Sequence, residues 1–215
     1  MLNKPDSTAE VIAASLREMI NRGELAEGTR LIERELASQF SVSRIPMREA
    51  IQQLEREGLV ESQRNRGAAV SRLTARDVNE IYQLRALAEG EAIALSVMNR
   101  NDETLARAGL VHQLLETAQT PQKQGELNRE FHHILYQGCN NGRLLKIIAE
   151  LCAQIERYEQ LQHRLLVDTP VFQQQHAAIL AAYRQGDAQL AREETVRHLA
   201  SARQRVLEII ARQPG

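Results

Sequence analysis

The pattern of apolar and polar positions divides the chain into a first part of short elements and a longer part that is helical throughout. In the first part, apolar residues recur at helical spacing from Val11 to Ile20. Ser7 and Glu10, three residues apart, form the capping box that is typical of a helix start. The pattern therefore predicts an amphipathic helix directly after Ser7.

Two shorter helices and a hairpin are predicted to follow. Residues 33–40 carry apolar side chains on one face, and a second helix runs from its N-cap residue Ser43 to the helix-ending Gly58. Residues 59–63 and 68–72 have β-compatible side chains and flank a short turn, which indicates a hairpin. This order of elements is that of a winged helix-turn-helix, in which one helix enters the DNA major groove.

The rest of the chain keeps helical spacing between breaks rich in Gly, Pro and Asn. The predicted helices are 77–98, 102–118, 125–138, 142–165, 170–184 and 187–212. We therefore predict a mostly α protein with two domains. They are a winged helix-turn-helix DNA-binding domain over residues 1–74 and an all-helical effector-binding and dimerisation domain over residues 75–215.

Composition and charge exclude some classes of protein but do not indicate a particular function. The formal net charge is −1, so any basic surface for nucleic acid must be local. Cys139 and Cys152 form no CxxC pair, which argues against a disulfide framework. We find no signal-peptide pattern and no apolar run near the ~20 residues that span a bilayer. We expect a soluble cytoplasmic protein.

Arginines and a glycine occupy the positions at which a winged helix-turn-helix meets DNA. Arginine is the side chain best shaped to bond guanine O6 and N7 or to fork a phosphate. Composition alone leaves open that Arg44 and Arg48 are ordinary surface charges at i,i+4 spacing. The candidate DNA contacts are Arg34, Ser43, Arg44, Arg48, Arg66 and Gly67.

The joint pattern of motifs over residues 8–72 resembles the GntR superfamily of bacterial transcription regulators. The matching runs, in order and at the right spacing, are 28–37, 42–50, 54–60 and 66–70. The resemblance implies operator binding by a homodimer that places two recognition helices on a pseudo-palindrome. It also implies that the DNA contacts of the family fall on Arg34, Arg44, Arg48 and Gly67.

Three of the later helices carry a histidine on or beside the apolar stripe. These residues are His132, His176 and His198, and helical geometry allows them to converge inside the bundle. Three neutral imidazoles are a common ligand set for zinc and other borderline metals. The alternative is that each histidine is simply a partly buried residue with satisfied hydrogen bonds. The remaining histidines fit no such pattern and are predicted at the surface, namely His112, His133 and His163.

Residues 77–210 resemble the all-helical FCD effector domain of the FadR-like branch of this superfamily. In metal-binding members of that branch, an Asp four residues before the first histidine completes the site, and this chain has Asn128 there. The resemblance implies a divalent metal, either zinc, nickel or manganese, held by the three histidines. Asn128 would be a weaker, uncharged fourth ligand, and a pocket that works without metal stays open.

Arg85 is a candidate contact for the effector, because the family often has Arg here, facing the pocket. Its guanidinium would fork a carboxylate, which implies a small organic acid as effector. The alternative is a structural ion pair with Glu89 at i,i+4 spacing. Tyr158 is a second candidate lining residue.

Together these features predict a ligand-responsive transcription regulator, most simply a repressor, that binds DNA and no membrane. The sequence has no HExxH motif, no Gly-rich phosphate loop and no evident nucleophile paired with histidine, so we do not expect an enzyme. Two alternatives stay open at this point. They are a metal-dependent hydrolase and a helical interaction module whose histidines are structural.

Overall fold

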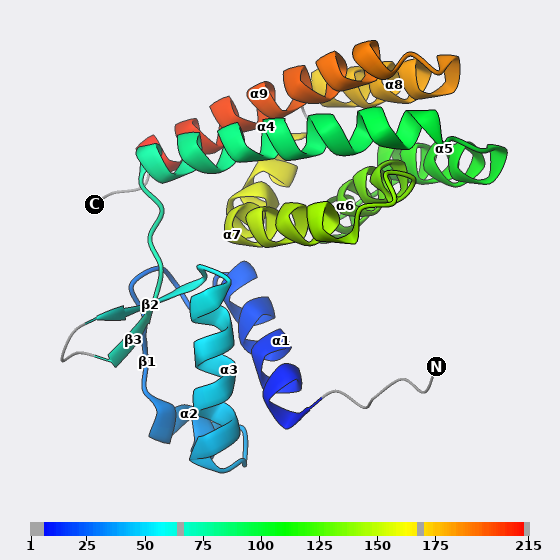
Figure 1. The fold of residues 1–215 in the computed structure, drawn as a ribbon. Coiled ribbons are helices and arrows are strands. Elements are labelled where there is room, and N and C mark those ends of the chain that lie inside the picture. The colour runs from blue at the N-terminus through cyan, green and yellow to red at the C-terminus, as the bar shows by residue number, and fades with distance from the viewer. Residues whose placement is uncertain (1–6, 64–66, 167–169, 213–215) are drawn as a thin grey trace. The chain divides into compact units, whose positions relative to one another are not determined.

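The chain forms two compact units, Met1–Leu73 and Thr74–Gly215 (Figure 1). Each unit has its own hydrophobic core. A computed structural model describes residues 7–63, 67–166 and 170–212. Throughout these ranges, no helix is both long enough and apolar enough to cross a membrane.

The first unit combines short helices with a small sheet. Its α1 helix begins at a capping box, in which the Ser7 hydroxyl accepts a hydrogen bond from Glu10 N at 3.2 Å. Leu16, Met47 and Leu54 are completely buried and belong to the core between α1 and α3. The elements in chain order are α1 (Thr8–Asn21), β1 (Arg30–Leu31), α2 (Glu33–Gln39), α3 (Arg44–Arg56), β2 (Val60–Gln63) and β3 (Gly67–Val70).

The sheet places β3 between β1 and β2 and antiparallel to both. Arg30 pairs with Ala69, and Val60 pairs with Val70. The sequence predicted the β2–β3 pair but missed β1, because a strand of two residues shows no alternation. With α2 and α3 beside it, this sheet confirms the predicted winged helix-turn-helix.

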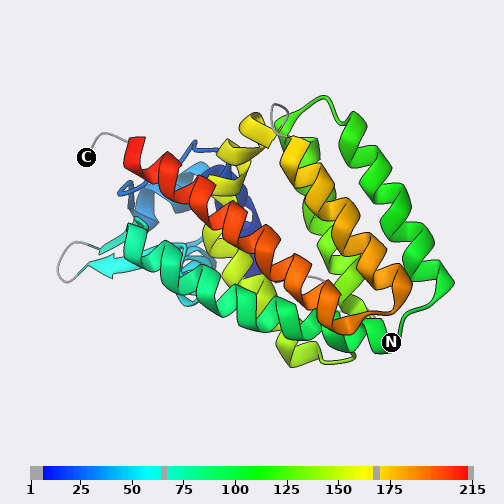
Figure 2. The same ribbon diagram turned by 90° about the horizontal axis from the view of Figure 1, so that it is seen from above.

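The second unit is an all-helical bundle, as predicted. In Figures 1 and 2, α4 and α9 run side by side in opposite directions, and their contact is the most extensive between the described helices of this unit. The elements are α4 (Ala75–Met98), α5 (Asp102–Thr117), α6 (Pro121–Gln137), α7 (Gly142–Leu166), α8 (Pro170–Gln185) and α9 (Ala188–Arg212).

Helix α6 begins four residues before the start that the sequence predicted. Thr120 is its N-cap and accepts a hydrogen bond from Lys123 N, and Pro121 occupies the first turn. A Thr-Pro pair is therefore a helix start here and not only the break that precedes one.

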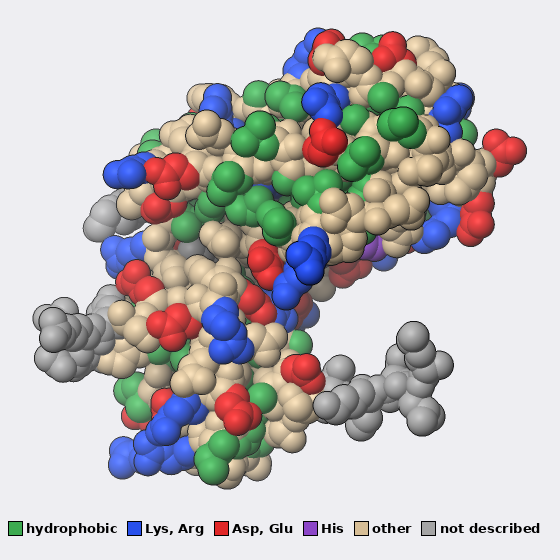
Figure 3. All heavy atoms as spheres, in the orientation of Figure 1, with side chains coloured by type: hydrophobic (Ala, Val, Ile, Leu, Met, Phe, Trp, Pro, Cys, Tyr) green, Lys and Arg blue, Asp and Glu red, His purple; other side chains and the backbone are tan. Residues whose placement is uncertain are grey.

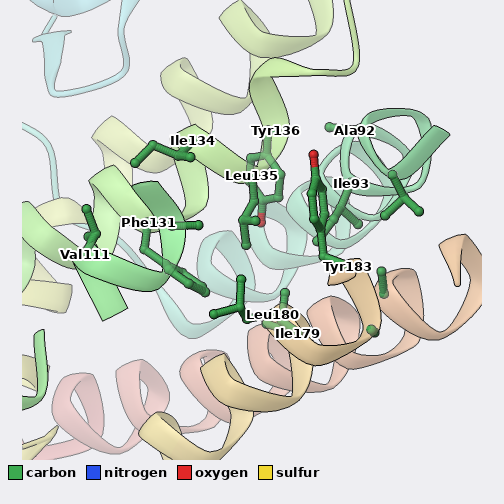
Figure 4. Packing of buried hydrophobic residues seen from close by; sticks show 14 of the residues in the cluster. Ala92, Ile93, Val111, Phe131, Ile134, Leu135, Tyr136, Ile179, Leu180 and Tyr183 are labelled. Atoms are coloured by element: carbon green, nitrogen blue, oxygen red, sulfur yellow. The ribbon is translucent and has the colours of Figure 1, made fainter. Parts of the chain in front are cut away.

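The core of the second unit is built around α6. Phe131, Ile134 and Leu135 are buried, and they belong to one cluster with Ile179 and Tyr183 of α8 (Figure 4). Helix α6 also packs against α4, α5 and α7. The position of any polar side chain on α6 is consequently fixed by core packing on several sides.

Candidate functional site

The first turn of α3 carries exposed arginines. Ser43 adopts the extended N-cap conformation, although its side chain makes no capping hydrogen bond. Arg44 is the first helical residue and Arg48 lies one turn later on the same face. Their side chains are 63% and 55% exposed, so both can reach a ligand. Figure 3 shows basic side chains gathered at this end of the unit, around α2 and the start of α3.

The other predicted DNA contacts lie on α2 and at the hairpin. Arg34 is exposed on α2. Gly67 opens β3 with a φ of 79°, in the left-handed region that favours glycine. Among the residues that the structure describes, no heavy atom lies within 4 Å of the position that a Cβ would take, so the backbone here is open to close approach. Arg66 lies outside the described residues.

Arg44 and Arg48 both contact one acidic residue, Glu33, that the sequence analysis did not single out. Arg48 Nε donates to Glu33 Oε1 at 3.1 Å, and Arg48 Nη2 donates to Glu33 Oε2 at 3.0 Å. Arg44 Nη2 lies 3.7 Å from the same Oε2. The hydrogen bonds from Arg48 lower the pKa of the Glu33 carboxyl below its ordinary value, so it is ionised at neutral pH.

In the second unit, the three predicted histidines meet. His132 comes from α6, His176 from α8 and His198 from α9, and all three are buried. Their ring centroids lie 4.6–5.2 Å apart. One ring nitrogen of each lies within 4.8 Å of those of the others. The predicted convergence is confirmed, and we call these three residues the histidine cluster.

Burial keeps members of the cluster uncharged. Loss of solvent lowers the pKa of His132 well below its ordinary value, and the nearby His176 and Arg85 act in the same direction. Burial likewise lowers the pKa of His198, with contributions from His132 and Arg85. A neutral imidazole is the form that coordinates a metal.

A chain of hydrogen bonds orients the ring of His132. The Tyr136 hydroxyl donates to Glu89 Oε2 at 2.9 Å and lies 3.2 Å from His132 Nδ1. Because the Tyr136 hydroxyl donates its proton to the carboxylate, the hydroxyl oxygen accepts a hydrogen bond from the protonated Nδ1 of His132. The lone pair of Nε2 is then left for a ligand. Arg85 Nε donates to Glu89 Oε1 at 2.6 Å and completes the chain.

His198 is oriented in a similar way. Its Nδ1 lies 3.1 Å from Gln175 Oε1, and Gln175 Nε2 donates to Ser201 Oγ at 2.9 Å. Because the amide oxygen can only accept, Nδ1 carries the proton and Nε2 is the unprotonated nitrogen. Two of the three imidazoles are thus held in the same tautomer by residues outside the cluster.

A cavity of about 430 Å³ lies between α4, α6 and α7 and shares His132 with the cluster. Two ion pairs line it, Arg85 with Glu89 and Arg129 with Glu156, the latter at 2.8 Å. The structural pair considered for Arg85 is thus present, and Arg85 still lines the cavity. The volume suits a small molecule, and the lining combines apolar side chains of α7 with polar and charged residues of α4, α6 and α7.

The remaining predicted residues divide between this cavity and the core. Asn128 lines the cavity together with His132. Tyr158 is buried on α7 and is not among the residues that line it. The surface prediction for His112 was wrong, because its ring is half-buried and its centroid lies 5.9 Å from that of the buried Phe131 ring. His133 is exposed, as predicted, and His163 has no described side chain.

Comparisons with known proteins assign a family to each unit. Residues 8–70 match the gntR family of bacterial regulatory proteins, and residues 80–201 match the FCD domain. Both matches agree with the resemblances drawn from the motifs.

Individual relatives agree with the family matches. An uncharacterised HTH-type transcriptional regulator of Bacillus subtilis, YdhC, is 34% identical over 68% of this chain and 67% of its own length. The gluconate operon transcriptional repressor of Bacillus licheniformis is 29% identical over 74% of this chain and 66% of its own. A crystal structure of a GntR family member from Pseudomonas syringae is 33% identical, with a TM-score of 0.61 over 95% of this chain and 86% of its own.

Proposed function

The chain belongs to the GntR family of bacterial regulatory proteins and carries an FCD domain, and from that premise we propose that it is an effector-responsive repressor. As a transcription regulator it is not an enzyme, which removes the hydrolase alternative. In our proposal, a homodimer binds a palindromic operator and releases it when a small organic acid enters the second unit. The observation that carries the proposal is the cavity beside the histidine cluster.

We assign the DNA contacts to the exposed arginines of the first unit. Arg44 and Arg48 would read base edges from the first turns of α3, with Ser43 beside them, and Arg34 would contact the backbone. Gly67 would allow the hairpin to approach the sugar-phosphate chain closely, and Arg66 would add a charge at its tip. Repression is supported by the relative from Bacillus licheniformis, which is a transcriptional repressor of the gluconate operon.

We assign the effector to the cavity lined by Arg85. A small acid would place its carboxylate near this guanidinium, and its apolar part would face α7. Glu89 fixes the direction of Arg85 through the 2.6 Å hydrogen bond to Nε, so the charge is positioned before the effector arrives. A structural role in the ion pair and a role in effector binding are therefore compatible.

The donor set of the histidine cluster fits a divalent metal. Neutral imidazoles suit zinc and nickel, and manganese is a harder ion that prefers oxygen. His132, His176 and His198 would hold the ion, and the Asn128 amide oxygen is the candidate for a fourth position. When bound, the ion would supply a positive charge beside the cavity and so favour an anionic effector.

A thermal-shift screen of the purified protein tests this proposal. Zinc, nickel or manganese should raise the Tm, and one of a panel of small organic acids should raise it further, because a ligand that binds only the folded state stabilises it. The same acid should reduce binding to operator DNA. The double variant His132→Gln/His176→Gln should lose the metal response, and the exposed His133→Gln should keep it.

The screen can also contradict the proposal. If no metal and no acid stabilises the protein, and none changes DNA binding, the histidines are core residues and the second unit is an interaction module.

A further inference from the structure

The carboxylate of Glu33 lies among the arginines that we assign to DNA reading. It accepts hydrogen bonds from Nε and Nη2 of Arg48 at 3.0–3.2 Å, and its Oε2 also faces Arg44 Nη2 at 3.7 Å. The side chain of Glu33 is only 29% exposed, whereas both arginines remain more than half exposed. An acid at a surface that binds a polyanion needs a physical explanation, because it opposes binding.

The stereochemistry of the Arg48 contact supplies that explanation. A guanidinium can form a bidentate fork along its Nε–Nη2 edge or at its Nη1–Nη2 end. Glu33 occupies the Nε–Nη2 edge of Arg48. A guanine presents O6 and N7 side by side in the major groove, and the Nη1–Nη2 end matches this pair of acceptors.

The charge of Glu33 acts in the same direction. A phosphate that approaches the occupied edge of Arg48 meets a carboxylate, so non-specific backbone binding is disfavoured. The carboxylate also fixes the rotamer of Arg48 before DNA arrives, which lowers the entropy lost on reading a base. Glu33 thus weakens binding to any DNA and improves the match to one sequence.

From these contacts we propose that Glu33 is a specificity-determining residue, which positions Arg48 for base reading and rejects phosphates at the recognition surface. The proposal rests on the assignment of Arg44 and Arg48 to DNA reading. It concerns discrimination between sequences and not the existence of DNA binding.

The experiment compares affinities for two duplexes of equal length and composition. One is a sequence selected by the wild-type full chain from a random pool, and the other is its scrambled version. Glu33→Gln keeps the side-chain size and removes the charge, so binding to the scrambled duplex should become tighter. The ratio of selected to scrambled affinity should fall about tenfold, the size of one lost base discrimination.

Three further comparisons separate the effect of the position of Glu33 from the effect of its charge. Glu35→Gln removes the same charge from an exposed residue of α2 and should leave the ratio unchanged. Glu33→Asp keeps the charge but is too short to hold Arg48, so the ratio should fall without tighter binding to the scrambled duplex. In an Arg48→Ala background, Glu33→Gln should have little further effect on the ratio, because it acts through that arginine.

The outcomes distinguish this inference from the proposed function. If the wild type selects no sequence, the assignment of DNA reading fails. If it selects a sequence and Glu33→Gln and Glu33→Asp discriminate as well as Glu35→Gln, only the role of Glu33 is overturned. Equal Tm values of the variants and the wild type establish that each variant is folded. If one variant is not folded, the comparison in the Arg48→Ala background decides whether Glu33 acts through Arg48.

Discussion

The hydroxyl of Tyr136 forms hydrogen bonds with Glu89 and with His132 of the histidine cluster. Its hydroxyl donates to Glu89 and lies next to His132 Nδ1, so it fixes which nitrogen of His132 carries the proton. A phenylalanine at this position would fill the same space and leave the ring of His132 without that restraint. The substitution Tyr136→Phe therefore tests the orientation of the His132 ring without changing the packing around it.

Replacing Tyr136 by Phe should weaken metal binding about 10- to 100-fold, as is usual when a partner of a ligand is removed. A competition titration with a chromophoric zinc chelator measures this change. Tyr183→Phe is the matched control, since its buried hydroxyl bonds Ser96 and no member of the cluster. Equal zinc affinities of the two variants would contradict the role assigned to Tyr136.

The protonation of the cluster predicts how stability depends on pH. Histidine has an ordinary pKa of 6.5, and the pKa values of His132 and His198 in the folded state lie well below it. Below pH 6.5 the unfolded chain binds protons that the folded chain does not, so stability falls with falling pH and is fully present above that value. Each histidine contributes up to about 1.4 kcal/mol per pH unit in this window.

Urea denaturation in the presence of a chelator, between roughly pH 5 and 8, tests this dependence. His198→Gln should flatten the acid side of the curve relative to the wild type, whatever its own stability. His133→Gln changes an exposed ring and should run parallel to the wild type. Parallel curves for all three proteins would mean that His198 is not held neutral by burial.

At the residue scale, the histidines and arginines of the two candidate sites could be predicted from the sequence, but most of the residues that form hydrogen bonds with them could not. His132, His176 and His198 were found because they share helix faces with apolar residues. Tyr136 could have been found as well, since it lies four residues after His132. Gln175 and Glu33 could not, because each meets its partner across two helices, and a single sequence contains no distance between helices.

At the scale of elements, the orientation of His132 depends on how α6 packs against α4. Glu89 of α4 and His132 of α6 are linked through one hydroxyl, so a small displacement between these helices breaks the link. Gly138 ends α6 against Ser96 of α4, and a Cβ at Gly138 would lie 2.5 Å from Ser96 Oγ. Ser96 is completely buried and bonded to Tyr183, so it cannot move aside freely.

Gly138→Ala should therefore lower the free energy of unfolding by about 1–3 kcal/mol, the usual cost of overpacking. It should also weaken zinc binding, because the helices that carry Glu89 and His132 are pushed apart. Gly109→Ala on α5 is the control, because a Cβ there would meet no atom of the described residues within 4 Å. That variant should be neutral or stabilising by up to about 1 kcal/mol. A Gly138→Ala protein as stable as Gly109→Ala would contradict the tight seating of α6.

The elements themselves were largely predictable. Long stretches with helical spacing, such as 77–98 and 187–212, correspond to α4 and α9 within one or two residues. The differences occur where local signals are short or ambiguous. β1 has two residues, and Thr120–Pro121 can both end a loop and cap a helix.

At the scale of the whole molecule, a regulator of the proposed kind couples two binding sites, one for the effector and one for DNA. An acid in the second unit changes DNA affinity only if it binds the DNA-free and DNA-bound forms with different affinities. The coupling is reciprocal, so operator DNA must weaken the effector by the same factor. The chain of hydrogen bonds from Arg85 to His132 joins the cavity to the cluster. We therefore expect a ligand bound in one of these sites to change the affinity of the other.

Selection of bound DNA from a random pool tests the central claim, sequence-specific binding by the first unit, most directly. We predict an inverted repeat for the wild type. Arg44→Ala should lose about 1–3 kcal/mol on that site and relax one position of each half-site, whereas Arg56→Ala, at the far end of α3, should keep the wild-type sequence. Enrichment of no sequence by the wild type, or an unchanged sequence for Arg44→Ala, would contradict the account.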